Sequence, residues 1–212
     1  MKRTIITTAA VAMLAMPAAL SAQPQPRTLT LAATPTAVKF GGSITLSGKL
    51  TDPNADARNV RIERDVLPLD SFENAGNATT NATGDWSLVV KPDANARYRA
   101  SVGNTDATPV DVTVRAAVSL RLSDRTPRRG QRVTFSGRVC PEHDAVTIAL
   151  QRRSSTGWKT IASPVLADIP GATCSSYSVV KRVRRNGAFR ARFLGDANLA
   201  AGNSRVKRAR VH

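Results

Sequence analysis

Aromatic and histidine residues are scarce in this sequence. Aromatic side chains make up 4% of the 212 residues, whereas apolar residues in total make up 42%. Cores with so few rings must consist mainly of Val, Leu, Ile and Ala, which leaves no room for a large buried active site. Only two histidines occur, His143 and His212, so the usual acid–base and nucleophile sets cannot be assembled. We therefore expect no enzyme, no bound metal and no other cofactor.

The sequence also lacks long apolar runs after its first 22 residues, so no later segment is expected to span a bilayer. Those first residues have the layout of a secretory signal peptide: a basic start, an apolar and Ala-rich stretch over 5–20, and small residues up to Ala22. We expect a signal peptide at 1–22, a short polar linker at 23–27, and a secreted or extracytoplasmic protein. A retained N-terminal anchor is the alternative.

Cysteine occurs only twice, as Cys140 and Cys174. In an exported protein an isolated pair indicates one disulfide rather than a metal site. Cys140 is followed closely by His143 and carboxylates, residue types from which a nucleophile or a zinc site can be built. Because the other histidine is the last residue of the sequence, we expect a disulfide that fixes a turn, with His143 exposed to solvent.

Helical periodicity of useful length is absent, and short segments alternate apolar with polar residues instead, as half-buried β-strands do. One such segment occurs twice, as Ile-Thr-Leu-Ser-Gly at 44–48 and Val-Thr-Phe-Ser-Gly at 133–137, each shortly after a glycine. This repeat predicts two similar domains, at 28–115 and 116–212, each with about six or seven short strands. The pattern predicts an all-β protein of two tandem antiparallel β-sandwiches.

No Gly/Ser-rich spacer separates the two halves at 114–118, which predicts a stiff end-to-end pair. Strands are expected in the first half at 29–31, 44–50, 60–63, 86–90, 98–102 and 110–114, with a loop and a weak edge strand between 69 and 84. Strands are expected in the second half at 118–122, 133–139, 146–151, 158–161, 177–183, 187–193 and 204–211.

Two segments of the second half resemble a known family. The run Phe-Arg-Ala-Arg-Phe-Leu-Gly-Asp-Ala-Asn at 189–198, with the later Ser204, is similar to the penultimate strand and Gly-Asp-x-Asn loop of bacterial immunoglobulin-like repeat domains. The run Arg-Gly-Gln-Arg-Val-Thr-Phe-Ser-Gly at 129–137 is similar to their second strand. The first half departs from the family, because Asn-Thr-Asp at 104–106 replaces Gly-Asp-x-Asn. Its membership rests on strand order and on the shared second strand.

The resemblance implies an immunoglobulin-like fold in an exported or cell-surface protein, a role in adhesion, spacing or display, and no catalytic set. In this fold the second and fifth strands are antiparallel neighbours. The end of one, at Cys140, then lies near the start of the other, at Cys174, within reach of a cross-strand disulfide.

Acidic residues are few in the second half. Residues 117–212 contain 5 Asp plus Glu against 19 Lys plus Arg, a net charge of +14, whereas residues 28–116 contain 10 against 9, a net charge of −1. A basic surface of this kind either is simply solvated or meets a polyanion, and the sequence leaves both open.

The strand at 187–193 alternates so that Phe189, Ala191 and Phe193 face the core, which turns its arginines toward solvent. The last strand adds further outward arginines, and two more lie near the sandwich edge. The predicted polyanion-binding residues are Arg182, Arg184, Arg190, Arg192, Arg208 and Arg210. Guanidinium groups bind phosphate and carboxylate with paired hydrogen bonds, which makes wall teichoic acids, acidic polysaccharides, anionic lipid headgroups or nucleic acid the physical candidates.

Specific nucleic-acid binding is not expected, because no recognition helix and no aromatic stacking platform between the arginines is evident. Trp86 and Trp158 are expected to be packing residues. The sequence thus predicts an exported, non-enzymatic adhesion or structural module of the cell envelope or surface, whose basic second domain is expected to bind anionic polymers and to hold the protein at the wall. The alternative is a protein-interaction or carbohydrate-binding module that uses the sandwich loops or an exposed strand edge.

Overall fold

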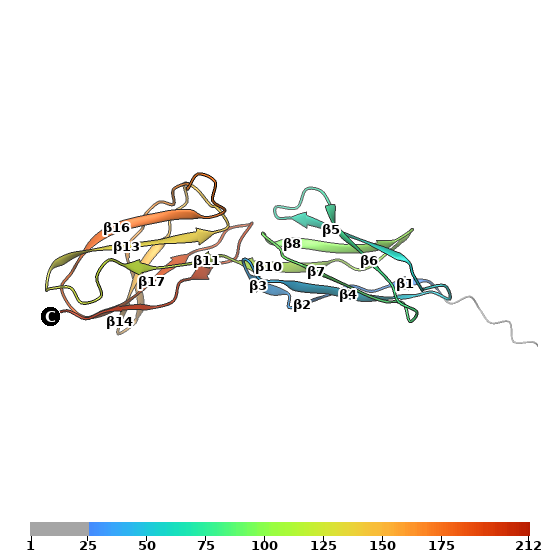
Figure 1. Ribbon diagram of the computed structural model, residues 1–212, viewed down its shortest axis with the longest axis horizontal. Coiled ribbons are helices and arrows are strands. Elements are labelled where there is room, and N and C mark those ends of the chain that lie inside the picture. The colour runs from blue at the N-terminus through green and yellow to red at the C-terminus, as the bar shows by residue number, and fades with distance from the viewer. Residues whose placement is uncertain (1–25) are drawn as a thin grey trace, which may run out of the picture.

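The computed structural model describes residues 26–212; the expected signal peptide at 1–22 and residues 23–25 of the expected linker lie outside this range. Every regular element in the described part is a β-strand, and the strands form two sandwiches arranged end to end (Figure 1). The predicted fold class, two tandem all-β sandwiches, is confirmed. No helix within residues 26–212 qualifies as a membrane span.

The first sandwich packs a four-stranded sheet on a six-stranded one. Its strands are β1 (Thr28–Leu29), β2 (Ala32–Thr34), β3 (Ala37–Lys39), β4 (Ile44–Thr51), β5 (Asn59–Val66), β6 (Glu73–Thr79), β7 (Asp85–Val90), β8 (Ala96–Val102), β9 (Thr105–Asp106) and β10 (Val110–Arg115). One sheet places β1 and β2 beside β4 and then β7; the other runs β3-β10-β8-β5-β6, with β9 on β8. All pairs are antiparallel except β3 with β10.

Two elements of the first sandwich differ from the expectation. The strand expected at 29–31 continues as β2 to Thr34. It ends there because Pro35 cannot donate the next ladder hydrogen bond, and the chain then crosses to the other sheet and forms β3. The expected weak strand between 69 and 84 is the full strand β6 at the sheet edge. Ala78 is its only buried residue, so the strand lacks the apolar alternation by which strands are recognised.

The second sandwich repeats the order with fewer strands. They are β11 (Ala117–Val118), β12 (Arg121–Leu122), β13 (Gln131–Cys140), β14 (Ala149–Ser154), β15 (Gly157–Ala162), β16 (Ser175–Val183), β17 (Gly187–Phe193), β18 (Gly202–Asn203) and β19 (Lys207–Ala209). One sheet places β11 and β12 beside β13 and then β16; the other runs β15-β14-β17, with β18 and β19 on the far side of β17. The last strands therefore neighbour the penultimate one, as expected for an immunoglobulin-like order.

Two predictions for the second sandwich were wrong in detail. A strand was expected over 146–151, but the ladder of β14 begins only at Ala149, and Val146 is 39% exposed. The single last strand expected at 204–211 is broken into β18 and β19. At the break the hydroxyl of Ser204 accepts a hydrogen bond from the backbone N–H of Ala191 and donates one to the carbonyl of Arg205, replacing lost ladder bonds.

The repeated glycine has the same structural cause in both sandwiches. Gly48 of β4 lies opposite Trp86 of β7, and a Cβ there would overlap the carbonyl of Thr30. Gly137 of β13 lies opposite Tyr177 of β16, and a Cβ there would overlap the carbonyl of Ser119. In each sandwich the glycine therefore allows the backbone at Thr30 or Ser119 to pass close to β4 or β13. An aromatic side chain of the neighbouring strand fills the space left by the missing side chain.

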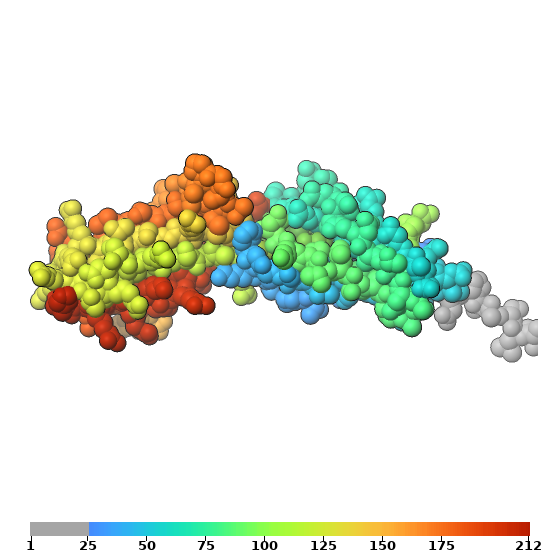
Figure 2. All heavy atoms as spheres, in the orientation of Figure 1, coloured from blue at the N-terminus to red at the C-terminus, as the bar shows by residue number. Residues whose placement is uncertain are grey.

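The two sandwiches meet without a free linker, and their surfaces are continuous across the joint (Figure 2). Asn95 is buried there: its backbone N–H donates to the carbonyl of Asn198 at 2.7 Å and its side-chain amide to the carbonyl of Ala197 at 2.9 Å. Its side-chain oxygen accepts from the N–H of Val114 at 2.8 Å. Phe40 of the first sandwich also packs against the second core. These contacts are consistent with a stiff joint.

Candidate anion-binding site

The arginines of β17 lie on the outer face of their sheet. Phe189, Ala191 and Phe193 are at most 3% exposed, so the intervening Arg190 and Arg192 point outward. Arg208 of β19 pairs with Ala188. Ala188 and Arg190 are two residues apart on β17 and point to the same side, so Arg208 shares this face. Three of the six predicted residues thus come together, as the alternation of β17 requires.

Trp158 lies among these arginines, contrary to expectation. It pairs with Arg153 across the β14–β15 hairpin, and the guanidinium of Arg190 lies 4.3 Å from its ring centroid, that of Arg153 5.6 Å. The ring is half-buried on the edge strand β15, as a packing residue can be, but the expectation of no aromatic side chain between the arginines was wrong. We call Arg153, Trp158, Arg190, Arg192 and Arg208 the arginine face.

The signal for Trp158 was present in the sequence. Because Ser154 pairs with Gly157 in a tight hairpin turn, residue 153 must lie opposite residue 158. Arg153 is therefore the candidate residue that sequence reasoning missed.

The electrostatics of the arginine face are unfavourable in the free protein. Burial lowers the pKa of Arg190, and repulsion from Arg192 and Arg153 lowers this pKa further. Its Nε donates to the side-chain oxygen of Gln151 at 2.8 Å, a neutral partner. Since an arginine keeps its charge at neutral pH, this repulsion is present throughout the physiological range.

The other predicted residues lie elsewhere on the second sandwich. Arg182 is on β16 in the opposite sheet, directly across from Arg132 of β13, and its Nη1 donates only to the carbonyl of Gly130 at 3.3 Å. Arg184 follows β16 in the turn to β17, and Arg210 follows β19. The structure therefore forms two basic groups on different sheets and not a single field of six.

Ion pairing differs sharply between the sandwiches. The first holds seven salt bridges, which involve residues such as Arg64 with Glu73 and Asp93, and Arg97 with Asp111. Within residues 26–212, the only salt bridge of the second sandwich joins His143 to Asp196. None of the 19 lysines and arginines from 117 to 212 has a carboxylate within 4.0 Å. Their charge is left uncompensated by the fold.

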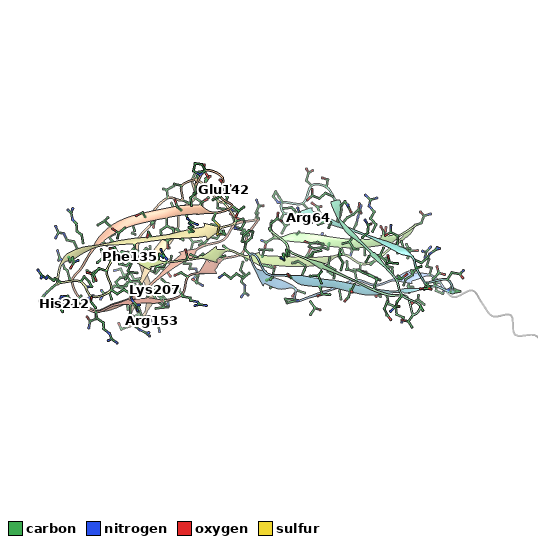
Figure 3. The ribbon with its side chains drawn as sticks, viewed as in Figure 1. Arg64, Phe135, Glu142, Arg153, Lys207 and His212 are labelled. Carbon is green, nitrogen blue, oxygen red and sulfur yellow. A yellow bond between two sulfur atoms is a disulfide. The ribbon has the colours of Figure 1, made fainter. Side chains whose placement is uncertain are left out.

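Four of the five acidic residues of the second sandwich gather toward the joint; the fifth, Asp124, lies near the start of β13, where it accepts a hydrogen bond from the side chain of Gln131. Glu142, Asp144 and Asp168 place carboxylate oxygens within 4.8 Å of one another, and Asp196 lies in the loop that contacts Asn95. Hydrogen bonds with Asp144 and Asp168 raise the pKa of Glu142. Figure 3 shows Glu142 on the joint side and Arg153 and His212 toward the opposite end. Negative charge is thus separated from the arginine face.

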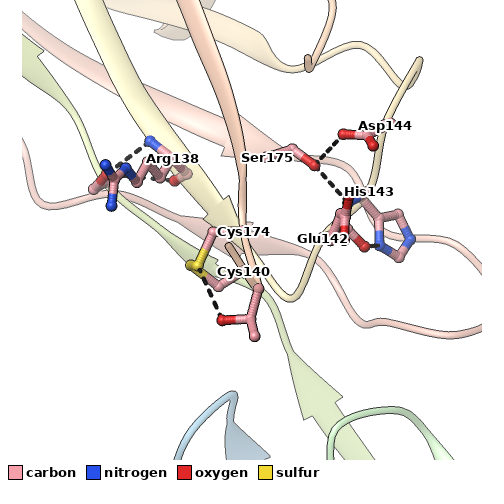
Figure 4. The surroundings of a disulfide bond; sticks show 9 residues. Arg138, Cys140, Glu142, His143, Asp144, Cys174 and Ser175 are labelled. Atoms are coloured by element: carbon pink, nitrogen blue, oxygen red, sulfur yellow. Dashed lines mark hydrogen bonds between the residues drawn. A yellow bond between two sulfur atoms is a disulfide. The ribbon is translucent and has the colours of Figure 1, made fainter. Parts of the chain in front are cut away.

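The expected disulfide joins Cys140 at the end of β13 to Cys174 just before β16 (Figure 4). The prediction that His143 is exposed was wrong: its side chain is 15% exposed, and its ring meets that of Phe193 edge-on at 5.2 Å between centroids. Its Nε2 lies 2.5 Å from a carboxylate oxygen of Asp196, and its Nδ1 lies 2.8 Å from the carbonyl of Glu142. The loop after β17 folds back over the ring, so that Asp196 contacts His143 although the two residues are 53 positions apart in the sequence.

Ser175 brings a serine, a histidine and an aspartate close together, but not as a nucleophile and its base. Its buried hydroxyl donates to Asp144 at 2.6 Å and accepts the backbone N–H of His143 at 2.7 Å. Both imidazole nitrogens face other oxygens, so the ring is not positioned to take the serine proton. The arrangement stabilises the turn after Cys140.

Comparison with known proteins gives little beyond the fold. No protein-family model matches the chain, and no curated protein sequence matches it. Among solved structures 1243 chains are similar, so the fold is widespread and does not by itself indicate a ligand. One is a tetra-tandem repeat from the extending region of a large adhesion protein, with a TM-score of 0.38 and 19% identity over 88% of this chain. The chain spans half the length of that structure.

Proposed function

We propose that this protein is a non-enzymatic adhesion or structural module of the cell envelope or surface, in which the second sandwich binds anionic polymers through the arginine face. The signal-peptide pattern at 1–22 and the disulfide support a location outside the cytoplasm. The resemblance to bacterial immunoglobulin-like repeats supports a surface role. The near-neutral first sandwich acts as a spacer.

The observation that carries the proposal is the contrast in ion pairing. Cations of the first sandwich are largely bonded to its own carboxylates, whereas the described part of the second sandwich pairs no lysine or arginine with a carboxylate. A merely solvated basic surface does not require like charges to be stacked on one ring, as Arg153 and Arg190 are on Trp158. Grouped arginines without internal counter-ions favour an external anion.

The spacing of the arginine face suits a repeating polyanion rather than a single ion. Arg190 and Arg192 lie two residues apart on one strand, or about 7 Å, and Arg208 lies on the neighbouring strand opposite Ala188, diagonal to Arg190 at about 7–8 Å. Several charges of a flexible polymer can therefore be met at once. Each exposed contact is weak, so the binding depends on their number.

A binding assay with charge-matched variants tests the proposal. Immobilised dextran sulfate and polyphosphate are probed with the protein, with the triple variant Arg190→Gln/Arg192→Gln/Arg208→Gln, and with Lys39→Gln/Arg58→Gln/Lys91→Gln in the first sandwich. The two variants have equal net charge, and the control positions are all exposed. We expect about tenfold or greater loss only for the arginine-face variant. Equal losses in both variants would show that net charge alone is responsible.

A second candidate function uses the outer edge of β16. Beyond Ser176 no strand of the described chain pairs with this edge, and Val180 on it is 53% exposed. Such an edge can pair with an extended segment of a protein partner. Binding to neutral proteins or uncharged sugars that persists at high salt and survives loss of the arginine face would favour this alternative.

A further inference from the structure

A pocket opens at the seam between the edges of the two sheets of the second sandwich. It has a volume of about 490 Å³ and lies between β15 and β16. Phe135, Ile161 and Phe189 form its apolar wall, and Arg152, Lys181 and Arg185 stand on its rim. We call it the seam pocket. It is distinct from the arginine face, because Arg152 pairs with the inward-facing Phe189 whereas Arg153 points to the outer surface.

The apolar wall of the seam pocket reaches the core. Phe135 is fully buried and Phe189 is 3% exposed, and their ring centroids lie 4.9 Å apart. Ile161 closes the wall from β15 and is only half-buried. A sandwich normally closes such a seam with aliphatic side chains, but here the inward position of β16 between Val179 and Val183 is Lys181.

Every charged residue that lines the seam pocket is a cation. Arg129, Arg182 and Arg184 join the three already named, and no aspartate or glutamate lines it. Within the described residues none of these six cations forms a salt bridge. The pocket therefore combines an apolar wall with a concentrated positive charge that the fold does not neutralise.

Arg152 is the cation held most firmly in place. Its Nη2 donates to the carbonyl of Asn186 at 2.8 Å, and its Nε lies so near Gly187 that a Cβ there would come within 2.7 Å. The Nε is buried and has no hydrogen-bond partner in the described chain. Burial and the charge of Arg185 both lower the pKa of Arg152. The Nε faces Gly187 and Nη2 is bonded to Asn186, so the guanidinium is held in place on the rim, and Nη1 is the donor left for an oxyanion.

We propose that the seam pocket binds a small amphipathic anion, namely a carboxylate, sulfonate or phosphate attached to one apolar ring or a short chain. The anionic group bonds to Arg152 and Arg185, and the apolar part lies against Ile161 and the phenylalanines. A pocket of this size accommodates such a molecule. A free oxyanion would contact only the cations of the rim, and a neutral ring would contact only the apolar wall. A ligand that carries both groups makes both sets of contacts and therefore binds with the highest affinity. This proposal does not depend on polymer binding by the arginine face.

Titration of the full-length protein with naphthalene-2-sulfonate, followed by backbone amide NMR, tests this proposal. The expected shifts are confined to residues around 152, 161, 181 and 185, and inorganic sulfate and 2-naphthol bind at least about tenfold more weakly. Sulfonate that binds no more tightly than sulfate, or shifts that centre elsewhere, would refute the seam pocket as its site.

Variants separate the pocket from general charge. Arg185 is exposed, so Arg185→Gln keeps the fold and is expected to weaken naphthalenesulfonate binding about threefold or more, with a larger loss for Arg152→Gln. Arg138→Gln, an exposed change on the other sheet, is the matched control and leaves the affinity unchanged. The arginine-face triple variant also retains the affinity. Equal effects of Arg185→Gln and Arg138→Gln would overturn the proposal.

Discussion

At the scale of single residues, the repeated glycine shows how a local pattern encodes a non-local contact. Gly48 on β4 and Gly137 on β13 occupy equivalent positions. Each lies against a backbone carbonyl near the start of its sandwich and beside an aromatic residue of the next strand in the sheet, β7 or β16. In the second sandwich that aromatic residue, Tyr177, donates its hydroxyl to the Ser119 carbonyl at 2.6 Å. Any side chain on the glycine would separate these groups.

The substitution Gly137→Ala is expected to destabilise the second sandwich by about 3 kcal/mol, because the methyl group overlaps backbone and displaces the Tyr177 hydroxyl. Gly130→Ala is the comparison: Gly130 has φ of 83° but nothing within 4 Å of a Cβ, so only about 1 kcal/mol of backbone strain is expected. Urea unfolding measures both. A smaller effect for Gly137→Ala than for Gly130→Ala would contradict the packing explanation.

At the scale of strands and turns, the disulfide closes the segment that links the two sheets. Cys140 and Cys174 are 34 residues apart, and β14, β15 and the long loop before β16 lie between them. Removing the bond with Cys140→Ala/Cys174→Ala is expected to reduce the stability of the second sandwich by about 3–4 kcal/mol, since the unfolded loop gains entropy.

Urea unfolding with and without reductant, followed through NMR signals of the second sandwich, measures this loss. Reductant should destabilise the wild-type protein to about the level of the double alanine variant and leave that variant unaffected. A wild-type protein equally stable in reductant would rule out a stabilising role for the bond.

Period-2 alternation predicted most strand interiors, because the two faces of a strand follow from its own sequence. Phe189 and Phe193 inside, with Arg190 outside, required no knowledge of other elements. The contact of Arg190 with Trp158 was missed because it depends on the pairing of β14 with β17, and the burial of His143 because its cover comes from a loop 53 residues away. Arg182 was grouped with the others although it lies on β16 in the opposite sheet, and Arg184 although it lies in the turn after β16.

At the scale of the whole molecule, a stiff joint aligns two sandwiches of unlike charge. Asn95 forms hydrogen bonds with Ala197 and Asn198 of the second sandwich, and with Val114 at the end of the first. These contacts could not be inferred from the missing spacer alone, because they join residues about a hundred positions apart. Four of the five acidic residues of the second sandwich lie toward this joint, and none of the five pairs with a lysine or arginine.

Replacing Asn95 with alanine is expected to loosen the joint, because it removes two side-chain hydrogen bonds worth about 1 kcal/mol each. Backbone ¹⁵N relaxation should show one shared tumbling time for both sandwiches in the wild type and two shorter ones in Asn95→Ala. Asn59→Ala, at an exposed position on β5, should resemble the wild type. Unchanged tumbling of Asn95→Ala would mean that other contacts hold the joint.

The central claim is that uncompensated arginines of the second sandwich bind anionic polymers, and the salt dependence of that binding tests it most directly. The association constant of the protein for polyphosphate is measured across about 50–500 mM NaCl. The account predicts a linear decrease of its logarithm with the logarithm of salt concentration, and a slope shallower by about 2 for Arg190→Gln/Arg192→Gln/Arg208→Gln. A slope near zero, or one unchanged in that variant, would contradict the account.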